Sequence, residues 1–208
     1  MRTLIAVPCM DQVAAPFAQN LAQMQKNGEV YISFLIGSLI YESRNNLAKQ
    51  AMQAKADYIM WLDSDMTFAP DTMTRLQQHM ENGLDIVTGI YFRRRPPFTP
   101  TLFKELRRTD DPNVAEHANF DDYPQDSLFE IAGCGFGCVM TRVSVLEDVM
   151  LNYQDWFGPV CGLGEDLSFC LRARELGYKI YCDSSIKCGH IGQLVVDEDV
   201  FRSTRSVD

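Results

Sequence analysis

The chain has 208 residues, the length of one ordinary domain, and could bury about 70% of the surface that its unfolded form exposes. Apolar residues make up 46% and charged residues 23%, a balance that excludes a disordered chain. Its 28 acidic and 19 basic residues give a net charge of −9, which argues against a protein whose main role is gripping nucleic-acid phosphates.

Hydropathy and cysteine usage indicate the compartment. No apolar run reaches the roughly 20 residues that a membrane-spanning helix needs, so we expect no transmembrane segment. The apolar run before Pro8 is too short for a signal peptide. Seven cysteines, odd in number and irregular in spacing, favour buried thiols over disulfides. These features predict a cytoplasmic protein.

Strand and helix patterns alternate along the first 90 residues. Apolar runs predict strands at 3–7 (ended by Pro8), 29–36, 58–62 and 84–90. Helical spacing predicts one helix from Pro16 to Gly28, a second capped by Ser43, and a third that begins at Pro70 and stops before Gly83. This order predicts an α/β fold, with a mainly parallel sheet and helices on both faces.

The alternation breaks after residue 92. Residues 104–127 are polar and acidic, and we predict a long loop there. Strand patterns at 128–132 and 137–141 lie on either side of a glycine turn, and they are followed by a helix at 165–176 and a last strand at 178–182. No linker is visible, so we predict a single domain over residues 1–192 and a polar tail over 193–208.

Two carboxylates follow the strand predicted at 58–62. In an open α/β sheet, ligands bind where the strands end, and Asp63 and Asp65 fall at such a point. Together they could hold one hard divalent cation, or they could divide between a cation and a ribose hydroxyl. The plainer alternative is that they only cap the following turn.

Two later features also carry chemistry. Glu165 and Asp166 open the helix at 165–176, where the helix dipole favours ionised acids, so they serve either as helix stabilisers or as a base for an acceptor hydroxyl. His190 lies between Gly189 and Gly192, after the last strand. An imidazole there could add a ligand for manganese, although single histidines are more often structural.

These features, in this order, resemble the GT-A-fold glycosyltransferases, and among them the family-2-like enzymes with their short bacterial and phage-type members. The resemblance covers about residues 3–192. It rests on Asp63-Ser64-Asp65 after a strand, the segment Gly133–Gly137, Glu165-Asp166, Gly189-His190, and the stretches 43–48 and 56–66. It implies a Rossmann-like central sheet with helices on both faces.

The resemblance also implies a nucleotide-sugar donor, first of all a UDP-sugar, and a divalent metal, Mn²⁺ or Mg²⁺, that holds the donor's diphosphate. In this pattern Asp65 matches a direct metal ligand, Asp63 a ribose or water-mediated metal contact, and His190 the late histidine of the metal site. The residues that match other donor contacts are Pro8, Cys9, Met10, Asp11, Arg44, Asn45 and Ser64.

On the acceptor side, Asp166 matches the base of inverting members, with Glu165 beside it. In a retaining enzyme the same residue would bind the acceptor. Gly135 and Phe136 belong to a segment that could lie against the acceptor, or that could simply form a tight turn. Trp156 could stack on a sugar, although a core position is the commoner fate of tryptophan.

The acceptor itself is weakly specified. The processive synthases of the family carry a Gln-X-X-Arg-Trp segment and membrane helices, and this chain has neither, which predicts one sugar per event. The runs 93–95 and 107–108 are all arginine and could steer a glycan, a lipid-linked acceptor or modified DNA. They could equally pair with the aspartates at 110, 111, 121 and 122.

Two other classes of function remain open at this point. A nucleotidyltransferase would share the sheet and an acidic metal site, but it would carry a glycine-rich basic loop after the first strand, and residues 7–11 lack one. A binding module without catalysis could keep the fold, although it would not need Asp63, Asp65, Asp166 and His190 together.

Overall fold

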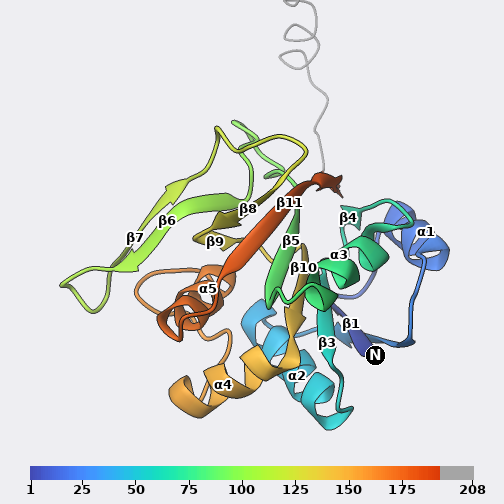
Figure 1. The fold of residues 1–208 in the computed structure, drawn as a ribbon, viewed down its shortest axis with the longest axis horizontal. Helices are drawn as coiled ribbons and strands as arrows, with labels where there is room; N and C mark the ends of the chain where they lie inside the picture. Colours follow the sequence, from blue (N-terminus) through green and yellow to red (C-terminus); the bar gives the residue numbers. More distant parts are fainter. Residues whose placement is uncertain (193–208) are drawn as a thin grey trace, which may run out of the picture.

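The computed structural model describes residues 1–192, so the predicted tail over 193–208 lies outside the described residues. Its centre is a seven-stranded sheet (Figure 1). In spatial order the strands are β2 (Glu29–Ile36), β1 (Arg2–Cys9), β3 (Tyr58–Leu62), β10 (Cys138–Arg142), β5 (Ile86–Ile90), β11 (Ile180–Lys187) and β8 (Leu128–Ile131). Only β10 and β8 run against the other five, which confirms a mainly parallel α/β sheet.

Helices cover both faces of this sheet, as the sequence predicts. On one face, apolar residues of α1 (Ala15–Gln23) and α3 (Thr72–Glu81) share a core with the strands. On the other face lie α2 (Ile40–Gln53), α4 (Val143–Tyr153) and α5 (Glu165–Glu175). The strands feed both cores because their side chains alternate: Leu4 and Ala6 enter one, Ile5 and Val7 the other.

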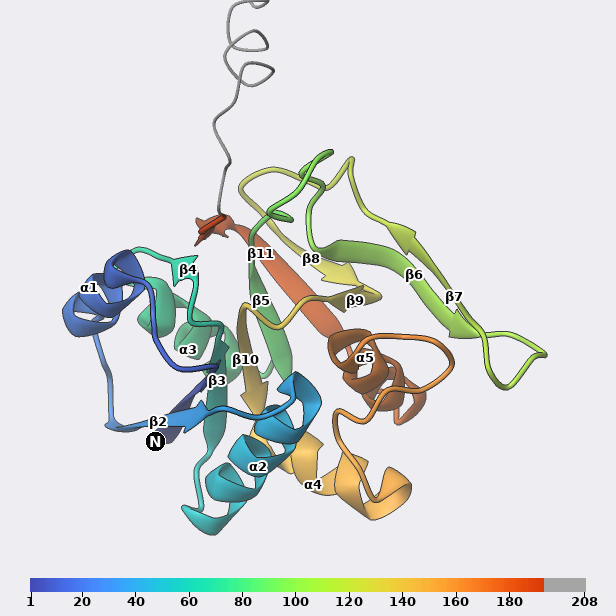
Figure 2. The same ribbon diagram turned by 180° about the vertical axis from the view of Figure 1, so that it is seen from behind.

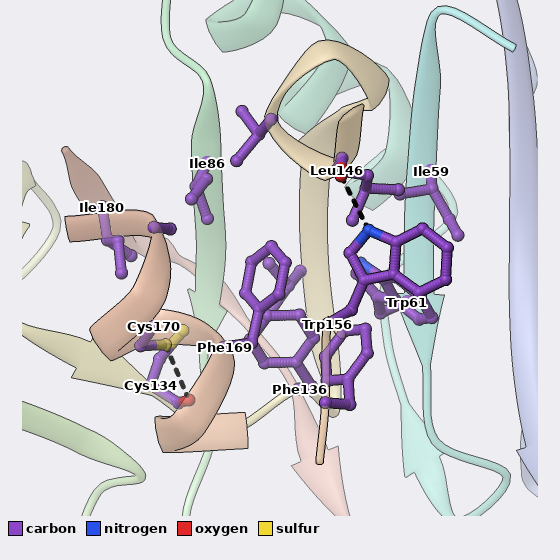
Figure 3. Packing of buried hydrophobic residues seen from close by; sticks show 14 of the residues in the cluster. Ile59, Trp61, Ile86, Cys134, Phe136, Leu146, Trp156, Phe169, Cys170 and Ile180 are labelled. Carbon is purple, nitrogen blue, oxygen red and sulfur yellow. Dashed lines mark hydrogen bonds between the residues drawn. The ribbon is translucent and has the colours of Figure 1, made fainter. Parts of the chain in front are cut away.

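Aromatic rings fill the core beneath the carboxyl ends of the strands. The ring centroid of Phe136 lies 5.9 Å from that of Trp61 and 5.3 Å from those of Phe157 and Phe169. Figure 3 shows Trp61, Phe136 and Phe169 packed together between α5 and the central strands. Aromatic rings in tilted and edge-on contact pack favourably, and this packing holds the residues at the carboxyl ends of the strands in place.

The loop predicted over 104–127 is wrong. Instead β6 (Leu102–Arg108) and β7 (Ala115–Asn119) form an antiparallel hairpin, and β9 (Gly133–Cys134) pairs with the other edge of β6. Figures 1 and 2 show this hairpin at the opposite end of the molecule from α1. A register shift between Phe103 and Glu105 breaks the two-residue alternation, so a sequence pattern could not reveal the strand.

The glycine segment is not a hairpin turn either. β8 pairs with β11 at one edge of the sheet, whereas β10 lies between β3 and β5 near its middle. Residues 132–137 therefore cross from the edge to the centre of the sheet, beneath the carboxyl ends of the strands. This path places Gly135 and Phe136 at the site described below.

Several predicted boundaries also differ. β1 continues through Pro8 to Cys9. Pairing with β3 stops at Ala6, so no strand on that side needs a hydrogen bond from Pro8, which has no N–H. α1 ends at Gln23, well before Gly28. α2 begins at Ile40, so Ser43 is a buried interior residue and not a cap. α4 was not predicted, because its apolar positions continue directly from β10.

Candidate functional site

The candidate site lies where β3 and β5 end. Asp63 follows β3 directly, and its N–H donates to the Gly137 carbonyl at 3.1 Å. A short strand, β4 (Met66–Thr67), then pairs antiparallel with β12 (Gly189–His190) and sets Met66 opposite His190. The Ile191 N–H also donates to the Asp65 carbonyl at 2.8 Å. This pairing brings together residues that are 122 to 126 positions apart in the chain.

A cavity of about 1350 Å³ opens at this point. Most of the predicted site residues line it: Arg44, Asp63, Ser64, Asp65, Gly135, Phe136, Glu165, Asp166 and His190. They come from α2, the end of β3, the crossing segment, the start of α5 and β12. The structure thus gathers the acidic motifs and the histidine around one space.

Arg44 joins three of these elements. Its Nη2 lies 2.9 Å from Asp63 Oδ1 and its Nε lies 3.4 Å from Glu165 Oε1. The guanidinium carbon lies 5.6 Å from the Phe136 ring centroid, and Nη1 is buried without a hydrogen-bond partner among the described residues. Burial raises the pKa of Asp63, and the Arg44 charge opposes that rise. Asp63 is therefore already engaged by a cation of the protein.

Asp65 has two different neighbours. Its Oδ1 lies 3.5 Å from His190 Nε2, and its Oδ2 lies 2.5 Å from Arg94 Nη1. Burial would raise the pKa of Asp65, but the hydrogen bond and charge of His190 and the charge of Arg94 hold it below its usual value. His190 Nδ1 donates to the Phe92 carbonyl at 2.9 Å, which leaves Nε2 directed at Asp65.

This donor set fits a divalent metal in one respect and not in another. An imidazole whose Nδ1–H is held by a carbonyl presents Nε2 as a ligand, and a carboxylate lies beside it, a pair suited to manganese. Among residues 1–192, however, no three His, Cys, Asp or Glu side chains group into a metal site. Asp65 and His190 come together, whereas Asp63 turns to Arg44, so the arrangement favours the divided roles over a shared cation.

Asp166 is a buried carboxylate of the cavity with a raised pKa. Burial, and then the charge of Glu165 beside it, raise its pKa to about 6, against the opposing effects of the Leu167 N–H and Arg44. A carboxylate with a pKa near 6 is a better proton acceptor at neutral pH than an ordinary aspartate. Its position at the first turn of α5 directs it to the same space as Asp65.

Several predicted contacts do not reach the cavity. Pro8, Cys9, Met10 and Asp11 are absent from its wall, and residues 12–15 line it in their place. Met10 is 69% exposed. Asn45 instead holds a loop, because its Nδ2 donates to Asp155 Oδ1 at 2.9 Å and its Oδ1 accepts the Phe157 N–H at 3.0 Å.

The stacking role expected for Trp156 is wrong. Its side chain is buried in the core, and its Nε1–H donates to the Leu146 carbonyl at 2.7 Å (Figure 3). Of the two arginine runs, only residues 93–95 line the cavity. Arg107 and Arg108 pair with Glu116 and Glu175 of the hairpin and α5, and not with the aspartates of the predicted loop.

Tyr91 was missed by the sequence interpretation. It follows β5 directly, its hydroxyl accepts the Gly137 N–H at 3.0 Å, and its ring packs edge-on against His190, with 5.5 Å between centroids. A Cβ at Gly135 would lie 2.1 Å from that hydroxyl, so glycine is required there. The only available signal was its place at the end of a predicted strand of the same sheet as the acidic motif.

Comparison with known proteins decides the family. The model of glycosyl transferase family 2 matches residues 40–150, which is more than half of the chain. The chain belongs to glycosyl transferase family 2. The matched range includes Arg44, Asp63 and Asp65, which line the part of the cavity built by α2 and the end of β3. A search of curated proteins by sequence found no match.

Solved structures support the same fold. The glycosyltransferase resembles A197 from STIV with a TM-score of 0.68 at 20% identity, over 95% of this chain and 87% of that one. The structure of GalNAc-T7 with UDP, GalNAc and Mn²⁺ matches with a TM-score of 0.62 at 10% identity, over 93% of this chain and 44% of that one. The structure of S. aureus TarS 1–349 in complex with UDP-GlcNAc matches with a TM-score of 0.56 at 15% identity, over 99% of this chain and 65% of that one. The predicted GT-A fold is confirmed.

Over residues 1–192, no helix combines the length and the apolar character that crossing a bilayer requires.

Proposed function

We propose that this glycosyltransferase moves one sugar from a nucleoside-diphosphate sugar to an acceptor hydroxyl, with inversion of configuration. The observation that carries the proposal is the placement of Asp166, with its pKa raised to about 6, in the same cavity as Asp65 and His190. Two structural neighbours were solved with UDP or a UDP-sugar, which supports a UDP-sugar as the first donor to test. The single-domain organisation over 1–192 is part of the proposal.

The chemical step is a displacement at the anomeric carbon. The acceptor oxygen forms a bond to that carbon, its proton passes to the Asp166 carboxylate, and the bond to the diphosphate oxygen breaks with its electron pair. Glu165 lies 3.4 Å from Arg44, and its charge helps to raise the pKa of Asp166. The acceptor hydroxyl must therefore lie between Asp166 and the sugar.

Asp65 and His190 would hold the divalent metal, Mn²⁺ or Mg²⁺, and Asp63 would bind the donor's ribose while Arg44 orients it. The bound cation would offset the negative charge that develops on the departing diphosphate. Gly135 lets the chain pass close to Tyr91, which supports His190 by ring packing. The Mn²⁺ in the GalNAc-T7 structure supports manganese as the first metal to test.

The cavity also supports a soluble or peripheral acceptor that presents a single hydroxyl. Phe103 from β6 and Gly135 from the crossing segment line the same cavity as Asp166, so the start of the hairpin β6–β7 would contact the acceptor. A transfer assay with a glycan, a lipid-linked sugar and a modified DNA base, each presenting a hydroxyl nucleophile, distinguishes the three acceptor classes.

Donor binding tests the proposal directly. We expect one nucleoside diphosphate of a panel to raise the unfolding temperature of the protein when Mn²⁺ is present. Calorimetry should then give the dissociation constant of that nucleoside diphosphate in the presence of Mn²⁺. Asp65→Ala should abolish the metal-dependent part of this affinity while the fold persists. Unchanged affinity in Asp65→Ala would remove Asp65 as a ligand, and no response to any nucleotide would leave a binding module as the better account.

A further inference from the structure

Three consecutive arginines lie on one ordered loop at the cavity. Residues 91–101, which we term the arginine loop, fold back on themselves through backbone hydrogen bonds. The Arg93 N–H donates to the Thr99 carbonyl at 2.9 Å, the Phe98 N–H to the Arg95 carbonyl at 2.9 Å, and the Thr101 N–H to the Tyr91 carbonyl at 3.1 Å. The loop therefore presents its arginine side chains from a defined backbone.

These arginines have different partners. Arg93 Nη2 lies 3.4 Å from Asn119 Oδ1, and its guanidinium carbon lies 5.9 Å from the Phe103 ring centroid, so it faces the hairpin. Arg94 faces the other wall and pairs with Asp65. Arg95 lines the cavity and forms no ion pair within residues 1–192. Only Arg94 contacts a residue to which we assign the metal.

We propose that Arg94 is a positioning residue that exchanges partners, leaving Asp65 when a divalent cation binds and then binding the donor's diphosphate. This exchange depends on one part of the proposed function, namely that Asp65 is a metal ligand. It adds a role for a residue that the family match and the acidic motifs leave without one.

Charge and geometry support the exchange. Both oxygens of Asp65 are engaged, Oδ1 near His190 and Oδ2 by Arg94, so a cation held by Asp65 and His190 and the Arg94 guanidinium would share one carboxylate. Two positive groups within a few ångströms of each other in a partly buried site repel strongly. A nucleoside diphosphate brings new negative oxygens to this point, and a guanidinium binds phosphate oxygens in a bidentate manner.

Burial decides which arginine can move. Arg44 is 2% exposed and is held by two carboxylates, so it stays with Asp63 throughout. Arg94 is 49% exposed and holds a single carboxylate, and an ion pair with so exposed a partner is weak because solvent screens it. The cavity therefore has one fixed cation and one exchangeable cation, on adjacent carboxylates of the same motif.

The test compares Arg94→Gln with Arg95→Gln in the full chain. Both variants remove one positive charge from the same loop, but only the first removes the contact with Asp65. Without nucleotide, free Mn²⁺ measured by electron paramagnetic resonance should show threefold to fivefold tighter Mn²⁺ binding in Arg94→Gln, since about 1 kcal/mol corresponds to about fivefold. Arg95→Gln should change that affinity by less than twofold.

A second measurement must move in the opposite direction. At saturating Mn²⁺, calorimetry with the nucleoside diphosphate that binds wild-type protein best should show about tenfold weaker binding in Arg94→Gln, because a charge-assisted hydrogen bond is lost. The nucleotide affinity of Arg94→Lys should fall between those of wild-type protein and Arg94→Gln. If Arg94 had a merely structural role, Arg94→Gln would weaken the binding of both Mn²⁺ and nucleotide, or of neither. Thermal unfolding of each variant checks the fold.

The outcomes separate the two proposals. If wild-type protein binds no Mn²⁺, the metal assignment fails and the exchange fails with it. If wild-type protein binds Mn²⁺ but Arg94→Gln binds it no more tightly than Arg95→Gln does, only the exchange is overturned. Unchanged nucleotide affinity in Arg94→Gln would likewise reject the second half of the exchange.

Discussion

Arg44 and Asp63 form an ion pair between the inner face of α2 and the first residue after β3, with 2.9 Å between Nη2 and Oδ1. The guanidinium also reaches Glu165 at the start of α5 and lies over the rings of Trp61 and Phe136. The aromatic faces offset in part the unpartnered Nη1, because an aromatic face attracts a cation. One buried side chain therefore ties α2 and the end of β3 to the start of α5.

Replacing that arginine should be costly. In Arg44→Met the two carboxylates lose their buried counter-charge, and removing one partner of a buried pair costs about 3–5 kcal/mol. Urea denaturation at pH 7 measures the loss in free energy of unfolding. Arg107→Gln, which breaks an ion pair that is exposed on both sides, is the control and should cost less than about 1 kcal/mol. An equal cost in both variants would contradict a structural role for Arg44.

Asp166→Asn should separate activity from stability. The variant loses the proton acceptor and so should lose transfer, while donor affinity stays within about twofold. It should also be more stable at pH 7, because ionising a carboxyl whose pKa is raised by about two units costs the folded state up to about 3 kcal/mol. Calorimetric unfolding with and without donor measures stability and donor affinity, and an assay of sugar transfer measures activity. Full transfer activity in Asp166→Asn would remove it as the base.

The same group sets a pH dependence with a defined sign. Because the folded-state pKa of Asp166 is raised to about 6, its protonated form stabilises the fold, and that contribution is lost as the pH rises through about 6. The stability advantage of Asp166→Asn should thus be absent below about pH 4 and complete above about pH 7. Wild-type transfer should rise about tenfold per pH unit below 6 and level off above it. A flat profile between pH 5 and 7 would contradict this assignment.

Gly135 and Tyr91 should be energetically coupled. Gly135→Ala places a methyl carbon 2.1 Å from the Tyr91 hydroxyl, so the ring must move and release the Gly137 N–H. We expect a loss of about 2–3 kcal/mol in stability, with lower transfer because His190 loses its ring contact. In the Tyr91→Phe background, without the hydroxyl, the same substitution should cost distinctly less. A double-mutant cycle by urea denaturation measures the difference, and strict additivity would reject the coupling.

Trp156→Phe tests the correction made by the structure. The indole is buried and donates to the Leu146 carbonyl, so the change should cost about 2 kcal/mol through lost volume and an unpaired acceptor. Donor affinity and the KM for acceptor should stay within about twofold, because the ring does not line the cavity. A large rise in KM with unchanged stability would restore the stacking role.

The sequence alone determined the α/β class, most strand positions and the residues that carry charge at the strand ends. These features depend on local patterns: the apolar run 58–62 must be a buried strand, and Asp63 and Asp65 must then fall at its carboxyl end. The order of the acidic motifs and His190 was enough to indicate a GT-A glycosyltransferase, and the family match over 40–150 agrees.

Tertiary structure decided which of those residues meet. The pairing of β4 with β12 brings His190 to Asp65, and the burial of Arg44 assigns it to Asp63, neither of which any local pattern encodes. The hairpin β6–β7 escaped prediction because a bulge interrupts its alternation, and its strands are stabilised by pairing with segments such as β9 that lie far along the chain. The same long-range packing buried Trp156 and brought Tyr91 and Arg94 into the cavity, since burial and ion pairing depend on neighbours that only the folded chain supplies.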